Sequence, residues 1–192
     1  YGNDYFTGPG TIVSQNTKGD DSRVIMDRTL PFIRGAIEKK SPFFAAVWFH
    51  TPHSPVVGGP KYREMYQDQP EHAQHYYACL TAMDEQIGRL RAELKSLGIA
   101  DNTMICFCSD NGPARQGSPR HVGTARNLKG YKLSLNEGGI RVPGLMVWPA
   151  KIKEPRTVTT PCFTSDYFTT ITHTSNCNWD IKFNWFFGKS IS

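Results

Sequence analysis

Residues 43–55 read FFAAVWFHTPHSP, an apolar run that is followed at once by two histidines and four further polar or proline positions. The run Phe43–Phe49 has no polar alternation, which is typical of a strand buried on both faces of a parallel sheet. A second apolar run, Thr103–Cys108, leads into the string SDNGP at residues 109–113. In open α/β sheets, ligands bind beyond the carboxyl ends of the strands. Both runs therefore predict ligand-competent side chains at one edge of a sheet.

A long amphipathic helix is predicted between these two runs. Apolar side chains from Tyr76 to Leu97 recur at alternating steps of four and three, which places them along one face of a helix. Gly98 follows as a suitable residue beyond the helix end. Because strand, helix and strand follow one another with a connection far longer than a hairpin, we expect a right-handed parallel crossover.

Other elements flank this unit. A helix is expected to begin at Asp21 or Ser22, either of which can cap it, and Pro31 is expected to kink or split that helix. Residues 144–148 form a third short apolar run. Residues 164–173 begin with Thr-Ser-Asp, which can cap a further helix. The whole pattern predicts an α/β chain.

The composition is that of a globular chain rather than a disordered or membrane-spanning one. The 192 residues are 39% hydrophobic and 20% charged, with a net charge of +5, and no apolar run is long enough to cross a bilayer. Lys and Arg are scattered, so we expect no nucleic-acid partner, although a basic surface favours anionic substrates. The five cysteines match no zinc pattern, and their odd number argues against a fully paired disulfide framework.

Asp110 and Asn111 supply a carboxylate and a carboxamide at the predicted end of a strand. Hard oxygen ligands of this kind suit Ca²⁺ or Mg²⁺. The same residue types also form ordinary turns, so this string alone leaves both interpretations open.

His53 lies between Pro52 and Pro55, which stiffen the backbone around it. A fixed imidazole beside an anion can donate a hydrogen bond to a sulfate or protonate a leaving oxygen. The alternative is a surface loop histidine. His50 is nearer to the strand and can support the loop.

Lys132 follows Gly130, which allows close backbone approach, so that the ammonium can meet an anionic group as a point charge. A solvated surface lysine is the alternative. Arg141 can pair with Glu137 or with a substrate.

In this order the strings resemble the sulfatase family of the alkaline phosphatase superfamily. That family characteristically shows Pro-His-x-Pro after an apolar strand, a long helix with a Met-Asp pair, Asp-Asn-Gly after a further strand, and Gly-x-Lys followed by Glu-Gly-Gly-x-Arg-x-Pro. This chain has the same series at residues 52–55, 83–84, 110–112, 130–132 and 137–143. The resemblance implies an α/β fold that is a partial parallel-sheet sandwich of the alkaline phosphatase-like type, with helices on both faces.

The resemblance also implies a sulfuric ester hydrolase that acts on sulfated carbohydrates or aryl sulfates. Asp110 and Asn111 would be half of the ligand set for a divalent cation, usually Ca²⁺ in this family, with Mg²⁺ as the alternative. As catalytic residues, His53 would contact the sulfate or the leaving oxygen, and Lys132 would stabilise negative charge on the sulfate. The residues expected to bind substrate are His53, Lys132, His50 and Arg141.

The family's nucleophile is missing from this sequence. A formylglycine is made from a Cys-x-Pro/Ala-x-Arg string, and none of the cysteines fits it; Cys162 comes nearest but lies after Lys132. We therefore expect residues 1–192 to be a fragment of one sulfatase catalytic domain that lacks the N-terminal nucleophile segment and the small C-terminal domain. Its parts would be an irregular lead-in at 1–20, an α/β core at 21–175 and a tail at 176–192.

Two other functions remain open. One is a phosphodiesterase or phosphonate monoester hydrolase of the same superfamily, and the other is a non-catalytic module that kept the anion-binding loops. The fragment alone is expected to be inactive. By family resemblance the parent protein would be extracellular, periplasmic or lysosomal; the sequence indicates no oligomeric state. Candidate rim segments are residues 56–75 and 113–127, including Arg115, Arg120, His121 and Arg126.

Overall fold

The computed structural model describes residues 5–6, 9–115 and 122–175. The predicted tail at 176–192 therefore lies outside the described residues, as do Arg120 and His121 of the predicted rim. In the described part, no helix is both long enough and apolar enough to cross a membrane. The main elements in chain order are β1 (Tyr5–Phe6), β2 (Ile12–Val13), α1 (Asp21–Glu38), α2 (Pro60–Arg63), η1 (Glu64–Tyr66), α3 (Glu71–Ser96), η2 (Ala100–Asn102), β3 (Ile105–Cys108), α4 (Glu137–Ile140), β4 (Gly144–Val147) and α5 (Thr164–Ser175).

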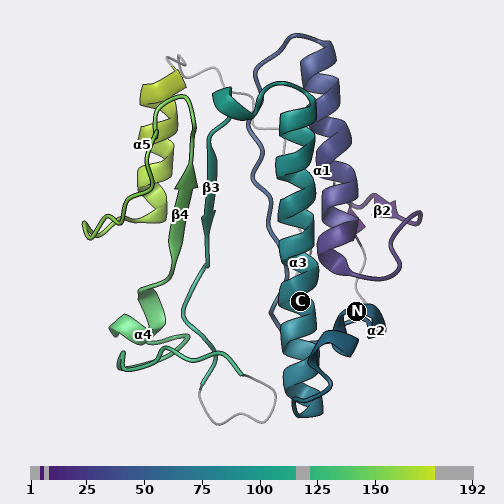
Figure 1. Ribbon diagram of the computed structural model, residues 1–192, viewed down its shortest axis with the longest axis vertical. Coiled ribbons are helices and arrows are strands. Elements are labelled where there is room, and N and C mark those ends of the chain that lie inside the picture. Colours follow the sequence, from purple (N-terminus) through teal and green to yellow (C-terminus); the bar gives the residue numbers. More distant parts are fainter. Residues whose placement is uncertain (1–4, 7–8, 116–121, 176–192) are drawn as a thin grey trace.

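Two parts of the molecule are distinct in Figure 1. The helical part consists of α1 and α3, which lie side by side, and the sheet part consists of β3, β4 and α5. Asp20 caps helix α1, since its side chain accepts a hydrogen bond from the backbone amide of Arg23 at 3.1 Å. The helix begins at the next residue, Asp21. Pro31 does not split this helix, contrary to one of the two expectations for it. The proline is exposed, so the loss of one backbone hydrogen bond there does not disturb the buried face of the helix.

The buried core lies between α1 and α3. The helix α3 presents small side chains and Gln86 at its most buried positions, whereas the predicted stripe from Tyr76 to Leu97 is mostly half-buried, with Leu94 as its one fully buried member. Small side chains let the two helices approach closely. The buried hydrophobic residues of the described chain are Val24, Met26, Leu30, Ile33, Ala73, Ala78, Cys79, Ala82 and Leu94.

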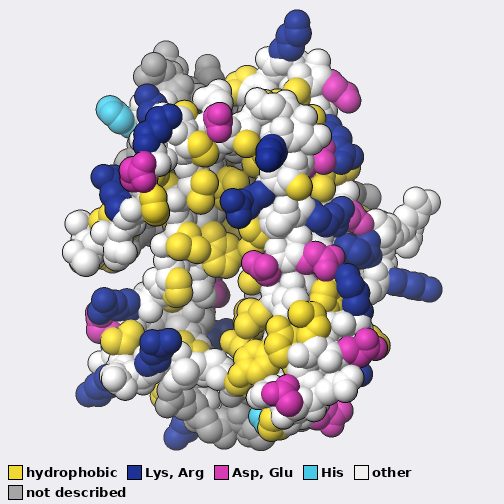
Figure 2. Space-filling model, in the orientation of Figure 1, with side chains coloured by type: hydrophobic (Ala, Val, Ile, Leu, Met, Phe, Trp, Pro, Cys, Tyr) yellow, Lys and Arg dark blue, Asp and Glu magenta, His cyan; other side chains and the backbone are white. Residues whose placement is uncertain are grey.

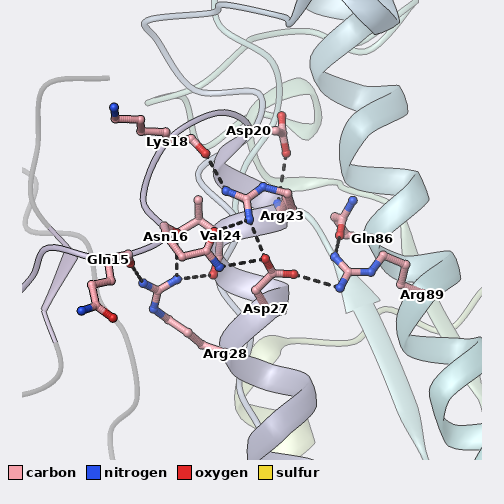
Figure 3. A network of polar contacts seen from close by, with 10 residues as sticks. All are labelled: Gln15, Asn16, Lys18, Asp20, Arg23, Val24, Asp27, Arg28, Gln86 and Arg89. Atoms are coloured by element: carbon pink, nitrogen blue, oxygen red, sulfur yellow. Dashed lines mark hydrogen bonds and ion pairs between the residues drawn. The ribbon is translucent and has the colours of Figure 1, made fainter.

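A polar network also joins the two helices (Figure 3). The carboxylate of Asp27 on α1 accepts hydrogen bonds from Asn16 at 3.0 Å and from Arg23, and its other oxygen pairs with Arg89 of α3 at 2.8 Å. Arg89 also donates to the buried side-chain oxygen of Gln86. One carboxylate thus connects the segment before α1 with α1 and α3.

The strand pairing differs from the prediction. β3 pairs with β4, and the pairing is antiparallel, with Ile105 opposite Val147. The segment Phe43–Phe49 is extended and runs in the same direction as β3 in Figure 1, but it belongs to no strand ladder among the described residues. The two segments run in the same direction and α3 connects them, but the parallel ladder expected between them is not formed among the described residues. A parallel ladder needs a neighbouring strand in register, and the strand beside β3 is the returning β4.

The expected burial of the first apolar run is wrong as well. Exposure alternates along Phe43–Phe49, and Trp48 is 62% exposed. The four residues of β4 are all exposed. Figure 2 shows apolar side chains gathered over the middle of the face it displays. The sheet part therefore presents apolar surface where an α/β sheet is normally covered.

The last helix agrees with its sequence signal. α5 begins at Thr164, and the amide of Phe163 donates to the carboxylate of Asp166 at 2.8 Å, which closes the helix start. Tyr167 on the same helix lies against Cys108 of β3. Burial, followed by its hydrogen bond to Cys108, raises the pKa of Tyr167 to about 12.

Candidate functional site

The motif loops lie at one end of the molecule. Phe43–Phe49 and β3 both run toward the end that carries α2 and α4, and the loops that follow them are found there (Figure 1). The loops therefore lie at one end, as the sequence predicted, even though the strand pairing differs.

The loop after β3 carries the predicted cation ligands. Asp110 is exposed, and Asn111 is half-buried. The side-chain nitrogen Nδ2 of Asn111 donates to the carbonyl of Gly112 at 2.8 Å, and the hydroxyl of Ser109 donates to the backbone carbonyl of Asn111 at 3.0 Å. These local bonds fix the turn and leave the carboxylate of Asp110 and the amide oxygen of Asn111 as its ligand-competent atoms.

This loop and the segment around Lys132 are hydrogen-bonded to each other. The amide of Gly112 donates to the carbonyl of Gly139 at 2.8 Å, and the amide of Lys132 donates to the carbonyl of Pro113 at 2.8 Å. A third bond of 2.8 Å, from Gly138 to the carbonyl of Lys129, closes the lysine segment on itself. The structure therefore brings Lys132 next to the Asp110–Asn111 turn.

Glycines make this close contact possible. A Cβ added to Gly112 would lie 1.9 Å from the carbonyl oxygen of Gly138, and a Cβ on Gly138 would lie 2.3 Å from the carbonyl oxygen of Gly130. Any side chain at these positions would force the two backbones apart. The Asp-Asn-Gly and Glu-Gly-Gly strings are thus two halves of one glycine-on-glycine contact, which we call the interlocked loops (residues 109–113 and 129–139).

Arg141 adopts the first of its two predicted roles. Its guanidinium pairs with the carboxylate of Glu137 at 3.2 Å, one helical turn away, and both side chains are largely exposed. Such a pair contributes little stability at the surface, so it remains available for exchange with an anionic ligand.

The loop of His53 is ordered by its own backbone. The amide of His53 donates to the carbonyl of His50 at 2.8 Å, and the two imidazoles lie 5.2 Å apart, centre to centre. Nδ1 of His53 lies 2.8 Å from the carbonyl oxygen of Ser54. A carbonyl can only accept, so Nδ1 carries the proton and Nε2 is the atom that can exchange one with a ligand.

Helix α3 supports both loop regions. A Cβ on Gly58 would lie 2.4 Å from the Cβ of Ala78, and the amide of Gly58 donates to His75 at 3.1 Å. A Cβ on Gly123 would lie 2.8 Å from the hydroxyl of Tyr76. The chain after His53 and the chain after the Asp110–Asn111 turn therefore rest on neighbouring residues of one helix. The Lys132 segment is joined to the Asp110–Asn111 turn directly, whereas the loop of His53 is joined to it through α3.

A cavity of about 330 Å³ opens beside the loop of His53, between that loop and the first turns of α3. It is large enough for a small ligand group. Its lining residues are Ser54, Pro55, Val56, Glu71, His72 and His75.

The cation ligands form an incomplete set. Within residues 5–6, 9–115 and 122–175, no three or more His, Cys, Asp or Glu side chains gather into a metal site. Ca²⁺ takes six to eight oxygen ligands and Mg²⁺ takes six. The oxygens of Asp110 and Asn111 fit part of such a site.

Sequence reasoning missed one residue of this region. Asp21 was predicted only as a possible helix cap, but its carboxylate accepts a hydrogen bond from the backbone amide of His50 at 3.3 Å. The pair of adjacent aspartates at the helix start was the available signal, because a helix needs only one of them as its cap, and Asp20 takes that role.

Three comparisons place the chain among known proteins. The Sulfatase family model matches residues 2–176. Steryl-sulfatase of Rattus norvegicus is 33% identical over 135 residues, which cover 67% of this chain and 22% of that protein. The ulvan-active sulfatase of Formosa agariphila is 29% identical over 171 residues, which cover 79% of this chain and 32% of that protein.

A solved structure agrees with these matches. The crystal structure of Ps i-CgsB in complex with k-i-k-neocarrahexaose superposes with a TM-score of 0.79 at 27% identity, covering 89% of this chain and 37% of that chain. The chain spans about a quarter of the length of curated relatives, with values of 28%, 24% and 22% for three of them. Since the family model covers nearly all of its residues, the chain belongs to the sulfatase family and forms part of an α/β domain of the alkaline phosphatase-like fold.

Proposed function

We propose that the protein containing these residues hydrolyses sulfate esters, and that the interlocked loops present its cation ligands and its sulfate-binding lysine together. The observation that carries this proposal is the direct backbone contact between the Asp110–Asn111 turn and the Lys132 segment. Membership of the sulfatase family supports the reaction class.

Each side chain has a chemical role in this proposal. The ammonium of Lys132 binds a sulfate oxygen and stabilises the negative charge that develops as the S–O bond breaks. Nε2 of His53 contacts the leaving-group oxygen. It donates the proton that this oxygen requires from the doubly protonated ring, in which Nδ1 keeps its hydrogen bond to Ser54. His50 and Arg141 are secondary contacts, and Arg141 would release Glu137 when it binds an anion.

Two groups would complete the site. Asp110 and Asn111 would hold a divalent cation, Ca²⁺ or Mg²⁺, which would neutralise charge on the sulfate group. A formylglycine from a segment outside residues 1–192 would supply the attacking oxygen. The donor set fits a cation because both residues offer hard oxygens on an exposed turn.

We propose a sulfated carbohydrate as the substrate class. The cavity beside His53 combines polar side chains with the apolar Pro55 and Val56, which suits one ring of a carbohydrate. The name of one relative refers to ulvan, and one similar solved structure is a complex with a neocarrahexaose. Further anionic groups could be met by cations of the neighbouring loops, which are Arg115 and Arg126.

The sulfate-binding part of the proposal can be tested on this chain by NMR titration with sodium sulfate, using sodium chloride at equal ionic strength as the blank. We expect sulfate-specific shifts at Lys132 and His53. A Lys132→Ala variant should lose them, whereas Lys129→Ala, which removes a neighbouring exposed cation, should retain them. Equal responses to sulfate and chloride at both residues would contradict the proposed sulfate site.

The hydrolytic part requires the complete domain. A longer polypeptide that carries these residues and a formylglycine segment should hydrolyse an aryl sulfate faster than an aryl methylphosphonate, and Lys132→Ala should abolish the difference. Residues 1–192 alone should show negligible turnover, because they contain no Cys-x-Pro/Ala-x-Arg string. Preference for the methylphosphonate would favour a phosphonate hydrolase instead.

A further inference from the structure

Asp21 is only 2% exposed, although it carries a carboxylate. Burying such a group is costly unless it is hydrogen-bonded. Its position in the first turn of the 18-residue helix α1 lowers that cost, because the helix N-terminus favours negative charge. Capping does not require Asp21, since Asp20 already accepts from the helix amide. Capping therefore does not explain why the carboxylate of Asp21 is buried, and other contacts must do so.

Both of its oxygens are used to hold other segments. Oδ1 accepts from the hydroxyl of Tyr5 at 2.5 Å, and Oδ2 accepts from the backbone amide of His50 at 3.3 Å. The next residue repeats the contact: Ser22 is fully buried, and its hydroxyl lies 3.4 Å from the hydroxyl of Thr51. Consecutive residues of α1 thus hold consecutive residues of the histidine loop.

Tyr5 keeps one oxygen of Asp21 permanently occupied. Burial, and then the hydrogen bond to Asp21, raise the pKa of Tyr5 far above its ordinary value. The phenol therefore remains a donor throughout the physiological pH range, and Oδ2 is the oxygen left for His50.

The orientation of His53 follows from the position of His50. The amide of His53 is hydrogen-bonded to the carbonyl of His50, their rings are in contact range, and Nδ1 of His53 is committed to Ser54. A movement of His50 would therefore change the position of the His53 ring.

We propose that Asp21 is a positioning residue that fixes the His50–Pro55 loop, with Ser22 as a second tether, so that the imidazole of His53 keeps one orientation and one tautomer. The consequence for sulfate binding rests on the proposed function of His53, whereas the positioning itself does not. Asp21 touches neither substrate nor cation in this account; it acts through His50.

The test uses the chain labelled with ¹⁵N. In the wild type the His50 amide should be protected from hydrogen exchange, and the ring nitrogens of His53 should show a proton on Nδ1 at neutral pH. Asp21→Ala should speed exchange at His50 by about tenfold or more and give His53 mixed tautomers. Asp21→Asn keeps an acceptor oxygen of the same size and should retain most of the protection.

The matched control is Asp27→Ala, which removes another carboxylate of α1 that holds neighbouring segments but does not contact the loop. It should leave His50 and His53 at their wild-type signals. If it disturbs His53 as strongly as Asp21→Ala, or if folded Asp21→Ala leaves His50 protected, the proposal is wrong. If Asp21→Ala does not fold, Ser22→Ala tests the second tether, and an unprotected His50 amide in the wild type would by itself contradict the assignment.

Addition of sodium sulfate separates this proposal from the proposed function. With both correct, Asp21→Ala should weaken the sulfate response at His53 while Lys132 still responds. A wild-type His53 that ignores sulfate, but changes its tautomer in Asp21→Ala, would contradict the proposed function and support the positioning role.

Discussion

The helical part and the sheet part of this molecule are stabilised in different ways. Every fully buried hydrophobic residue of the described chain belongs to α1 or α3, whereas the apolar residues of β4 are exposed, with Leu145 at 63%. The apolar faces of α1 and α3 pack against each other, whereas the apolar side chains of β4 remain exposed. The interlocked loops lie at the end of the sheet part, so their geometry depends on backbone hydrogen bonds and glycine contacts rather than on a surrounding apolar core.

The largest difference between the two parts should appear in core truncations. Leu94→Ala removes a side chain that is 2% exposed between α1 and α3, and it should lower the free energy of unfolding by about 2–5 kcal/mol. Leu145→Ala on β4 should change it by no more than about 0.5 kcal/mol. Urea unfolding followed by circular dichroism measures both values. Similar losses at the two positions would mean that the sheet part is packed as tightly as the helices.

A smaller effect is expected from crowding the interlocked loops. Gly112→Ala places a methyl group where the carbonyl of Gly138 lies and should cost about 1–3 kcal/mol. Exchange of the Lys132 amide should accelerate at the same time. Gly144→Ala on β4, where an added Cβ meets nothing within 4 Å, is the control and should leave the Lys132 amide unchanged. The same Lys132 exchange rate in both variants would rule out the glycine contact as the cause.

The smallest effect concerns the acid stability of the helical part. Burial alone would raise the pKa of Asp27, but hydrogen bonds from Asn16 and Arg89 outweigh it and lower that pKa. A carboxyl group whose pKa is lower in the folded chain stabilises it above its unfolded pKa, near 4, and this contribution is lost as the pH falls through the folded value. Asp27→Asn should therefore flatten the decline in stability below about pH 4.

Asp20 provides the control of opposite sign. Burial raises the pKa of its carboxyl, so its ionisation opposes folding as the pH rises through that range. Asp20→Asn should therefore make the loss of stability toward acid pH steeper. Thermal unfolding at about four pH values per pH unit, from about pH 2.5 to 6, measures this. Identical acid profiles for the two variants would contradict the assigned shifts.

The sequence was most informative where structure depends on nearby residues. The four-and-three spacing predicted α3, the Thr-Ser-Asp start predicted α5, and the order of the motif strings predicted that their loops would lie at one end. Close backbone approach was predicted only for Gly130, whereas the contact between Gly112 and Gly138 was found in the structure.

The sequence was least informative where a distant partner decides the outcome. Phe43–Phe49 has the composition of a central strand, but a strand forms only where another lies in register beside it. The buried role of Asp21 also depends on residues far along the chain, namely Tyr5 and His50, and no periodic pattern reports such contacts. That His53 and Lys132 bind the same sulfate stays a prediction.

The central claim is that the Asp110–Asn111 turn and the Lys132 segment form one interlocked unit. A nuclear Overhauser spectrum of the ¹⁵N-labelled chain tests it most directly, through the amides of Gly112 and Lys132. The account predicts cross-peaks from Gly112 to the α-protons of Gly138 and Gly139, and from Lys132 to Pro113. Absence of these cross-peaks, together with free exchange of both amides in a chain whose α1 and α3 are folded, would contradict it.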